Sequence, residues 1–225
     1  MEKVKVVVIL SGGLDSVTLL HRFVRGGYDC YPITFSYGQK HVKEIEYAKS
    51  NVLRLDLQNQ HKIVDVTALS DTLSSALIQE ANAIPDTSSE EQRTPDVLKK
   101  TVVPFRNGIF LSIAIGYANS LGIKIIAYGA HKNDYATYPD CRPTFVHAME
   151  LAARHGLEDY DFRLLAPYVL MTKDEIVKEG QAWGVDFSLT WSCYRGGDKH
   201  CGNCPSCVER KNAFKEIEDP TVYDV

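Results

Sequence analysis

The sequence predicts an α/β protein with a doubly wound, mostly parallel sheet, followed by a short cysteine-rich tail. Apolar runs at residues 4–10 and 123–127 lack polar alternation, as is typical of strands buried on both faces of a parallel sheet. Segments with helical periodicity separate the apolar runs, and this alternation predicts βαβ units. Four of the six cysteines lie within residues 193–207, a segment too small to form a core of its own.

The first half of the chain supplies three strands and two helices in alternation. A glycine turn follows the strand at residues 4–10, and the apolar residues of the next helix recur at helical spacing: Val17, Leu20 and Val24. Residues 31–35 form the second strand. The helix after it has an apolar face made of Val42, Ile45, Ala48 and Val52. Residues 63–66 form a third, short strand.

The second half continues the alternation with one interruption. Residues 83–100 are polar, contain two prolines and lack periodicity, so we expect a long mobile loop that acts as a lid or is disordered. Ile109, Phe110, Ile113 and Tyr117 mark the helix before the strand at 123–127. Thr172 and Glu175 form a capping box at the start of another helix, and a last helix lies around residues 208–217. We expect a main domain over residues 1–190 and a tail over residues 191–225.

Composition narrows the class of function. The 225 residues hold 25 Lys and Arg against 29 Asp and Glu, a net charge of −4, so the chain lacks the basic surface that nucleic-acid binding requires. No apolar stretch approaches the roughly 20 residues that span a bilayer. Residues 1–10 do not have the pattern of a signal peptide. We therefore expect a cytoplasmic protein with reduced thiols, no membrane segment and no nucleic-acid partner.

The most informative motif is Ser-Gly-Gly-x-Asp-Ser at residues 11–16, between the first strand and the first helix. Glycines let backbone N–H groups converge on phosphate oxygens, and the helix N-terminus adds about half a positive charge. Asp15 is an anion, so its predicted role is to hold the Mg²⁺ that neutralises a pyrophosphate. The lysine of a Walker loop and the Gly-x-Gly of a dinucleotide fingerprint are both absent. A glycine turn that only begins a helix is the alternative.

The tail has the spacing of a metal site. Cys193, Cys201, Cys204 and Cys207 form C-x7-C-x2-C-x2-C, which can surround one Zn²⁺ with four thiolates and leave no open position. An iron–sulfur cluster and simple buried thiols are the alternatives. With the ligand shell filled by sulfur, we expect His200 to be a solvated histidine.

Further motifs make the prediction more specific: Tyr37-Gly38-Gln39-Lys40-His41, Val103-Pro104-Phe105-Arg106-Asn107, residues 129–134, Tyr138-Pro139-Asp140-Cys141-Arg142-Pro143, residues 172–176 and Leu189-Thr190-Trp191-Ser192-Cys193. With the glycine loop and the four cysteines, they resemble the QueC family of N-type ATP pyrophosphatases. The resemblance covers about residues 6–214. The chain departs from the family pattern at Thr144, at Ala136 and Thr137, and at Phe105; these departures spare the glycine loop and the four cysteines.

The resemblance implies a ligase that uses ATP and ammonia to convert 7-carboxy-7-deazaguanine to 7-cyano-7-deazaguanine, a precursor of queuosine or archaeosine, in a cytoplasmic homodimer. It implies ATP contacts at Leu10, Ser11, Gly12, Gly13, Leu14, Asp15, Ser16, Val17, Thr18, Leu19 and Leu20. It implies substrate contacts at His131, Asp134, Tyr138, Asp140 and Arg142, structural zinc on the four cysteines, and catalytic roles for Asp15, Arg106 and Lys173. Arg106 and Lys173 both lie where a helix begins. Because the helix dipole disfavours a cation in that turn, Lys173 is a candidate for contacting ATP.

Two other classes of protein share these features. A tRNA-modifying thiolase or lysidine-forming ligase has the same loop, but it should present a basic face to RNA. A non-catalytic nucleotide-binding module with a zinc ribbon would bind ATP without turnover.

Overall fold

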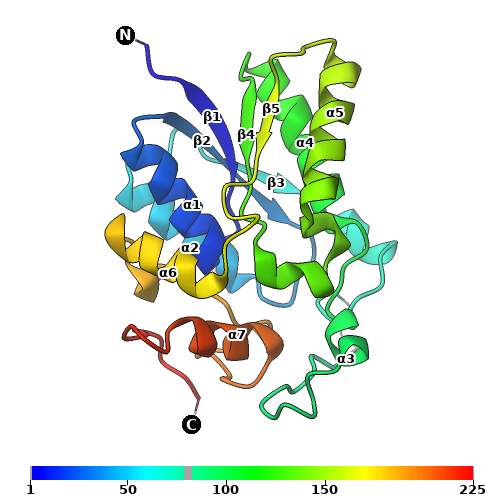
Figure 1. The fold of residues 1–225 in the computed structure, drawn as a ribbon, viewed down its shortest axis with the longest axis vertical. Helices are drawn as coiled ribbons and strands as arrows, with labels where there is room; N and C mark the ends of the chain where they lie inside the picture. Colours follow the sequence, from blue (N-terminus) through cyan, green and yellow to red (C-terminus); the bar gives the residue numbers. More distant parts are fainter. Residues whose placement is uncertain (1, 79–82, 225) are drawn as a thin grey trace.

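The computed structural model describes residues 2–78 and 83–224. Within this range one parallel sheet has the strand order β3-β2-β1-β4-β5 (Figure 1). The strands are β1 (Lys5–Ile9), β2 (Asp29–Ser36), β3 (Lys62–Asp65), β4 (Ile125–Ala127) and β5 (Arg163–Leu165). Val7 of β1 pairs with Tyr31 of β2 on one side and with Ile126 of β4 on the other. The predicted doubly wound sheet is confirmed.

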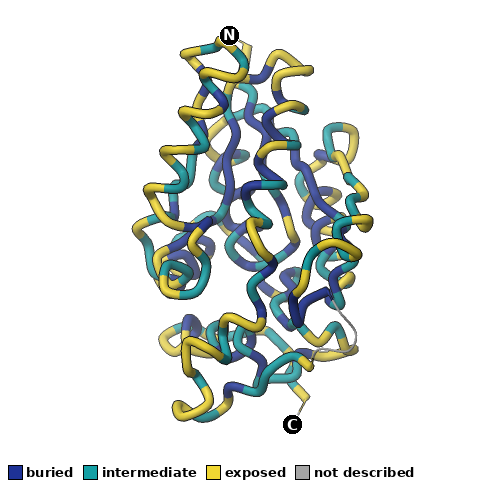
Figure 2. Tube along the Cα trace, turned by 90° about the vertical axis from the view of Figure 1, so that its right-hand side faces the viewer, coloured by how far each residue is buried: buried dark blue, intermediate teal, exposed yellow. Residues whose placement is uncertain are grey.

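Helices cover both faces of the sheet (Figure 1). One face carries α1 (Leu14–Arg25), α2 (Lys43–Arg54) and α6 (Lys173–Ala182), and the other carries α4 (Arg106–Ser120) and α5 (Pro143–Leu157). Each face has its own core, with Leu19 and Ile176 in one and Leu111 and Ile126 in the other. Figure 2 shows the strands as a buried centre inside exposed outer turns. No helix within the described residues is long and apolar enough to cross a membrane.

The tail lies beyond the carboxyl ends of the strands. Its helix α7 (Pro205–Ala213) is drawn below the sheet in Figure 1, near the segment that carries α3 (Pro95–Lys99). Packing of Phe187 against Phe214, with ring centroids 5.1 Å apart, joins the tail to the core under α1 and α6. The tail is thus placed over the edge of the sheet where ligands bind in open α/β folds.

Several elements differ from the sequence prediction. Helix α5 and strand β5 were not predicted, because β5 has only three residues and only Ala153 of α5 is fully buried, so neither has a clear apolar pattern. Residues 83–100 were predicted to be a loop, and they contain α3, which Thr94 caps by accepting a hydrogen bond from Val97 N–H. The last helix starts at Pro205, earlier than predicted, since proline suits the first position of a helix.

Candidate active site

A cavity opens at the carboxyl ends of β1 and β4, where the strand order reverses. The chain leaves β1 toward β2 and leaves β4 toward β5, so the two loops diverge and a crevice forms between them. The cavity has a volume of about 410 Å³, and residues of both loops line it, including Ser11, Asp15, Gly129 and His131. This volume suits a small-molecule ligand.

The glycine loop is tied together by its own serines. Ser11 N–H donates to Ser16 Oγ at 3.1 Å, and Gly13 N–H donates to Ser11 Oγ at 3.2 Å. Gly12 has φ +89°, and a Cβ there would lie 2.0 Å from the carbonyl oxygen of Glu44, so only glycine fits. No side chain caps α1, whose first-turn N–H groups can therefore bind an anion.

Five charged side chains from four parts of the chain meet beside this loop: Asp15, His131, Asp134, Lys173 and Glu209, which we call the charged cluster. Lys173 Nζ lies 3.2 Å from Asp15 Oδ2 and 2.7 Å from Glu209 Oε2. His131 Nε2 lies 3.6 Å from Asp15 Oδ2 and 3.4 Å from Asp134 Oδ2. Asn133 accepts a hydrogen bond from the Lys173 N–H at 3.1 Å, which fixes the start of α6 to the loop after β4. The cluster alternates acids with bases.

These contacts keep Asp15, His131 and Lys173 ionised. Burial alone would raise the pKa of Asp15, but Lys173 and His131 hold it well below its usual range. Burial alone would lower the pKa of Lys173, but Asp15 and Glu209 hold it above its usual range. The pKa of His131 rises to about 9, because Asp15 and Asp134 outweigh its burial. His131 and Lys173 are therefore both cations at neutral pH.

A second group of side chains lines the cavity: Tyr37, His41, Arg106, Tyr138 and Tyr194, which we call the aromatic cluster. Arg106 Nη1 donates to Tyr37 Oη at 3.1 Å, and the hydroxyl oxygens of Tyr138 and Tyr194 are 3.5 Å apart. Burial lowers the pKa of His41 to about 3, so this histidine is neutral. The aromatic cluster offers flat walls and one guanidinium cation.

Phe105, one of the departures from the family pattern, shapes the start of α4 and does not line the cavity. It has φ +55°, and its ring packs edge to face on Phe145 with centroids 5.8 Å apart. A Cβ at Gly108 would lie 2.3 Å from this ring. The Phe105 side chain is 58% exposed, so the departure concerns the outer surface of α4.

Glu44, in the first turn of α2, adds a buried carboxyl to the cavity wall. Its Oε1 accepts a hydrogen bond from Gln39 Nε2 at 3.0 Å, and its side chain is 12% exposed. Burial raises the pKa of Glu44 to about 7, although Arg106 and Gln39 act in the opposite direction. Glu44 was missed in the sequence analysis. The signal was its position four residues before Ala48 and seven before Asn51, both fully buried on the inner face of α2.

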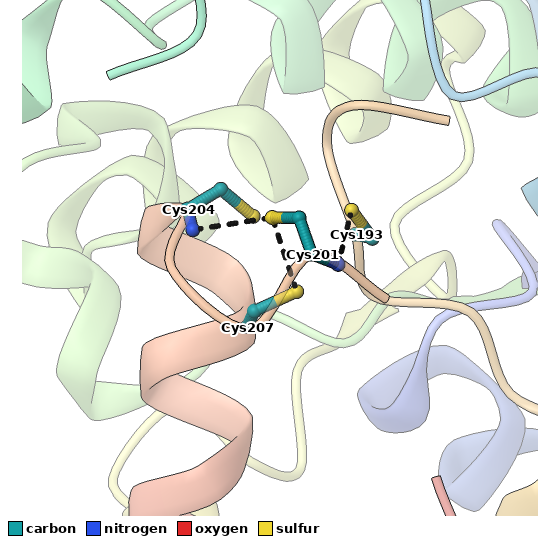
Figure 3. Close-up of side chains that lie close together, drawn as sticks. All are labelled: Cys193, Cys201, Cys204 and Cys207. Carbon is teal, nitrogen blue, oxygen red and sulfur yellow. Dashed lines mark hydrogen bonds between the residues drawn. The ribbon is translucent and has the colours of Figure 1, made fainter. Parts of the chain in front are cut away.

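The four predicted metal ligands meet in the tail (Figure 3). The sulfurs of Cys193, Cys201, Cys204 and Cys207 all lie within 4.8 Å of one another. Backbone N–H groups donate to two of them, Cys201 N–H to Cys193 Sγ and Cys204 N–H to Cys201 Sγ, each at 3.4 Å. Four converging sulfurs, two of which accept backbone hydrogen bonds, suit a tetrahedral thiolate-bound metal.

His200 was expected to be solvated, and that prediction is wrong. Its ring is 5% exposed and lies between Trp191 and Tyr223, with centroid distances of 4.3 and 5.8 Å. Its Nε2 accepts a hydrogen bond from Ser192 N–H at 3.0 Å, so this nitrogen is used in packing the tail.

The tail contributes directly to both clusters. Tyr194 follows Cys193 into the aromatic cluster, and Glu209 follows Cys207 into the charged cluster. Pro205 and Ser206, at the start of α7, also line the cavity. The positions of these cavity residues therefore depend on how the cysteine cluster holds the tail.

The segment at residues 83–100 closes the cavity from the side of the tail. Thr87 is fully buried, and its N–H donates to Asn203 O at 2.8 Å, while Asn203 Nδ2 donates to Asp86 Oδ2 at 2.6 Å. Thr87, Arg93 and Leu98 line the cavity. The segment therefore forms one wall of the cavity, next to the tail.

The structure brings some predicted site residues to the cavity and not others. Lining residues are Leu10, Ser11, Gly13, Leu14, Asp15, Ser16, Arg106, His131, Asp134, Tyr138 and Lys173. The predicted ATP contacts at Val17, Thr18, Leu19 and Leu20 lie in the buried part of α1. Asp140 accepts the Asn107 N–H at 2.9 Å, and the exposed Arg142 donates to Tyr135 O at 2.9 Å. Neither Asp140 nor Arg142 lines the cavity, and Gly12 contributes by backbone packing alone.

Comparison with known proteins agrees with this geometry. An NMN synthetase from Francisella tularensis has a TM-score of 0.52 and 11% identity, over 94% of this chain and 76% of that chain. A predicted subunit of a tRNA methyltransferase from Methanocaldococcus jannaschii has a TM-score of 0.50 and 16% identity, over 79% of this chain and 74% of that chain. At these identities the two structures show a common fold and nothing more.

The sequence comparisons are more specific. The 7-cyano-7-deazaguanine synthase of Caldicellulosiruptor saccharolyticus is 47% identical over 98% of this chain and 96% of its own length. The enzyme of the same name from Methanoregula boonei is 43% identical over 98% of this chain and 99% of its own length. The family model described as queuosine biosynthesis protein QueC matches residues 5–218. The resemblance inferred from the motifs is confirmed, and the chain belongs to the QueC family.

Proposed function

We propose that this protein is an ATP-dependent carbon–nitrogen ligase that converts 7-carboxy-7-deazaguanine and ammonia to 7-cyano-7-deazaguanine. Besides membership of the QueC family, the main support for this proposal is one observation. The glycine loop, with its Asp15–Lys173 ion pair 3.2 Å long, opens into the same cavity as an aromatic cluster that contains Arg106. A phosphate site and a site for a flat anionic ring would thereby be adjacent.

The reaction needs two activations at one carbon atom. In the first, a carboxylate oxygen attacks the α-phosphorus of ATP and pyrophosphate leaves. Ammonia then attacks the carbonyl carbon, AMP leaves with one oxygen, the nitrogen loses one proton to water, and the amide remains. In the second, the amide oxygen attacks the α-phosphorus of another ATP. Loss of AMP and of both protons from the nitrogen gives the nitrile.

The residues of the chain bind and orient the reactants. The first-turn N–H groups of α1 and the hydroxyls of Ser11 and Ser16 would bind the pyrophosphate. Lys173 would stabilise the charge that develops at the α-phosphate, and Arg106 would hold the carboxylate of the substrate. His131, Asp134 and Tyr138 would line the substrate side. Alignment of the acceptor oxygen with phosphorus supplies much of the acceleration.

Asp15 would hold Mg²⁺ at this site. Its Oδ2 is paired with Lys173, and its Oδ1 has no hydrogen-bond partner among the described residues. A buried carboxylate oxygen without a partner is a suitable ligand for a hard cation. When bound, Mg²⁺ would neutralise part of the negative charge of the phosphates.

The four cysteines would hold a structural Zn²⁺. Four thiolates leave no open position for water or substrate, so the ion would stabilise the tail and take no part in the chemistry. Metal analysis of the purified protein tests this: one zinc per chain is expected. A visible absorption band with acid-labile sulfide would instead assign an iron–sulfur cluster.

A homodimer in the cytoplasm completes the proposal. Reduced thiols, which the four-cysteine metal site requires, persist in that compartment. Light scattering of the purified, metal-loaded protein would give the mass of two chains, and a monomeric mass would contradict this part.

Mass spectrometry of a reaction with Mg-ATP, ammonium and 7-carboxy-7-deazaguanine tests the function. The wild-type protein should form the nitrile and consume ATP, whereas Asp15→Asn should form little nitrile and consume little ATP. Asp71→Asn makes the same chemical change at an exposed position outside the cavity and should match the wild type. Absence of nitrile with folded, metal-loaded wild type would refute the proposal.

A further inference from the structure

We propose that Glu44 recognises the guanine-type edge of the substrate by accepting hydrogen bonds from its ring N1–H and 2-amino group. This inference rests on the proposed function, because it names the residue that selects the substrate of that reaction. Neither the family motifs nor the charge pattern assigned Glu44 a role. The proposal rests on the position of Glu44 in the cavity wall and on its hydrogen bond from Gln39.

The carboxyl group of Glu44 is held in place by an amide that is itself fixed. Gln39 is 1% exposed. Its Oε1 accepts the Tyr37 N–H at 2.8 Å, and its Nε2 donates to Phe35 O at 3.2 Å as well as to Glu44 Oε1 at 3.0 Å. Glu44 is therefore a pre-positioned acceptor, which reduces the entropy lost when a ligand binds.

One oxygen of this carboxyl group is unused by the protein. None of the hydrogen bonds found among the described residues reaches Glu44 Oε2, and Glu44 lines the cavity. Its other oxygen, Oε1, faces Gln39 Nε2 and lies 3.4 Å from His41 Nε2. Arg106 is near enough to lower the pKa of Glu44, but it makes no ion pair with it within the described chain. An acceptor on a cavity wall without a donor is a site for the donors of a ligand.

The surrounding side chains suit a flat bicyclic ring. The ring of Tyr37 lies 5.3 Å from Phe110 and 6.4 Å from His41, measured between centroids, and His41 lies 5.5 Å from Tyr194. Aromatic walls bind a flat base by stacking and tolerate many bases, so the selection among bases must come from polar groups at the ring edge. Among the described residues, the charged groups of this part of the cavity with unused hydrogen-bonding capacity are Glu44 and Arg106. His41 Nδ1 also lacks a partner, but it is buried.

The chemistry of the ring edge favours deazaguanine over the adenine of ATP. Deazaguanine presents two adjacent donors, N1–H and the 2-amino group, and a carboxylate can accept from both. Adenine presents one amino donor beside the acceptor N1, which a carboxylate repels. A site built to accept two hydrogen bonds rejects a ligand that lacks one of them.

The test compares two ligands on three proteins by calorimetry. The ligands are 7-carboxy-7-deazaguanine and its analogue without the 2-amino group. The proteins are the wild type, Glu44→Gln, and Glu46→Gln as an exposed control on the same helix. We expect the wild type and the control to prefer the 2-amino ligand by about 10- to 100-fold. In Glu44→Gln, whose amide N–H₂ would oppose the ligand donors, that preference should fall to within about threefold.

The KM for ATP distinguishes the two rings that could contact Glu44, the deazaguanine of the substrate and the adenine of ATP. It should change by less than about twofold in Glu44→Gln if the residue contacts the base alone. Unchanged selectivity in Glu44→Gln would overturn the inference. If the KM for ATP also rose, Glu44 would instead contact the adenine of ATP. Binding is measured without turnover, so a wild type that binds selectively yet forms no nitrile would refute the proposed function and leave the inference standing. A melting temperature close to that of the control shows that the variant is folded.

Discussion

The charged cluster and the aromatic cluster line one cavity, but they are built in opposite ways. In the charged cluster each acid has a basic partner, as when Lys173 bridges Asp15 and Glu209. In the aromatic cluster the guanidinium of Arg106 bonds a neutral hydroxyl, and the nearby Glu44 bonds a neutral amide. The first arrangement neutralises itself when empty, so a phosphate must compete with internal ion pairs. The second leaves charge without an ionic partner, which favours selective recognition of a ligand.

The largest effect is expected from a substitution in the cysteine cluster, because it should disrupt the charged cluster and the aromatic cluster together. Cys204→Ser removes one of four thiolate ligands, so it should abolish metal binding and cost about 5 kcal/mol or more of stability. The tail supplies Tyr194 to the aromatic cluster and Glu209 to the charged cluster, so both clusters should be disrupted. Chemical denaturation and metal analysis measure the two effects. Cys30→Ala is the matched control, since Cys30 is buried in β2 and far from the other thiols in sequence. It should keep its metal and lose about 1–2 kcal/mol. A folded Cys204→Ser protein with full metal content would refute the metal assignment.

Breaking only the charged cluster should separate chemistry from base recognition. Asp15→Asn removes the anion that pairs with Lys173, and kcat should fall about 100- to 1000-fold because a pre-arranged electrostatic contact is lost. Affinity for 7-carboxy-7-deazaguanine without ATP should change less than about twofold. Single-turnover kinetics and calorimetry give the two values. A loss of base affinity equal to the loss in kcat would mean that the clusters act as one unit.

Glu44, beside the aromatic cluster, should make the stability of the protein depend on pH. Folding raises the pKa of Glu44 from 4.5 to about 7. The folded state therefore binds more protons than the unfolded state between these values, and stability falls as pH rises through them. Relative to Glu44→Gln, the wild type should match at pH 4 and be less stable by roughly 3 kcal/mol above pH 7. Urea denaturation of both proteins across this range measures the difference, and a pH-independent difference would contradict it.

The predictable part of this molecule is local in sequence. Strand, glycine loop and helix are contiguous over residues 5–25, so their pattern was enough to predict the strand and the helix that the structure shows. Four of the five residues of the charged cluster were among the predicted site residues. Glu209 was missed, because it meets Lys173 from 36 residues away and no spacing encodes that contact. Glu44 was missed for another reason. Its helical position indicated burial, but the bond from Gln39 that makes it a fixed acceptor needs a turn that the pattern does not specify.

The smallest expected effect defines the boundary of the aromatic cluster. Arg142 and Arg106 are both arginines at the start of a helix, but Arg142 is exposed and bonds the carbonyl of Tyr135, whereas Arg106 lines the cavity. Arg142→Gln should change stability by less than about 0.5 kcal/mol and kcat/KM by less than about twofold. Arg106→Gln, the same chemical change inside the cavity, should lower kcat/KM about 100-fold by removing a charge-assisted contact to the substrate carboxylate. Equal losses in both variants would extend the substrate site to the outer end of α5, since only a direct contact could make the exposed arginine matter as much.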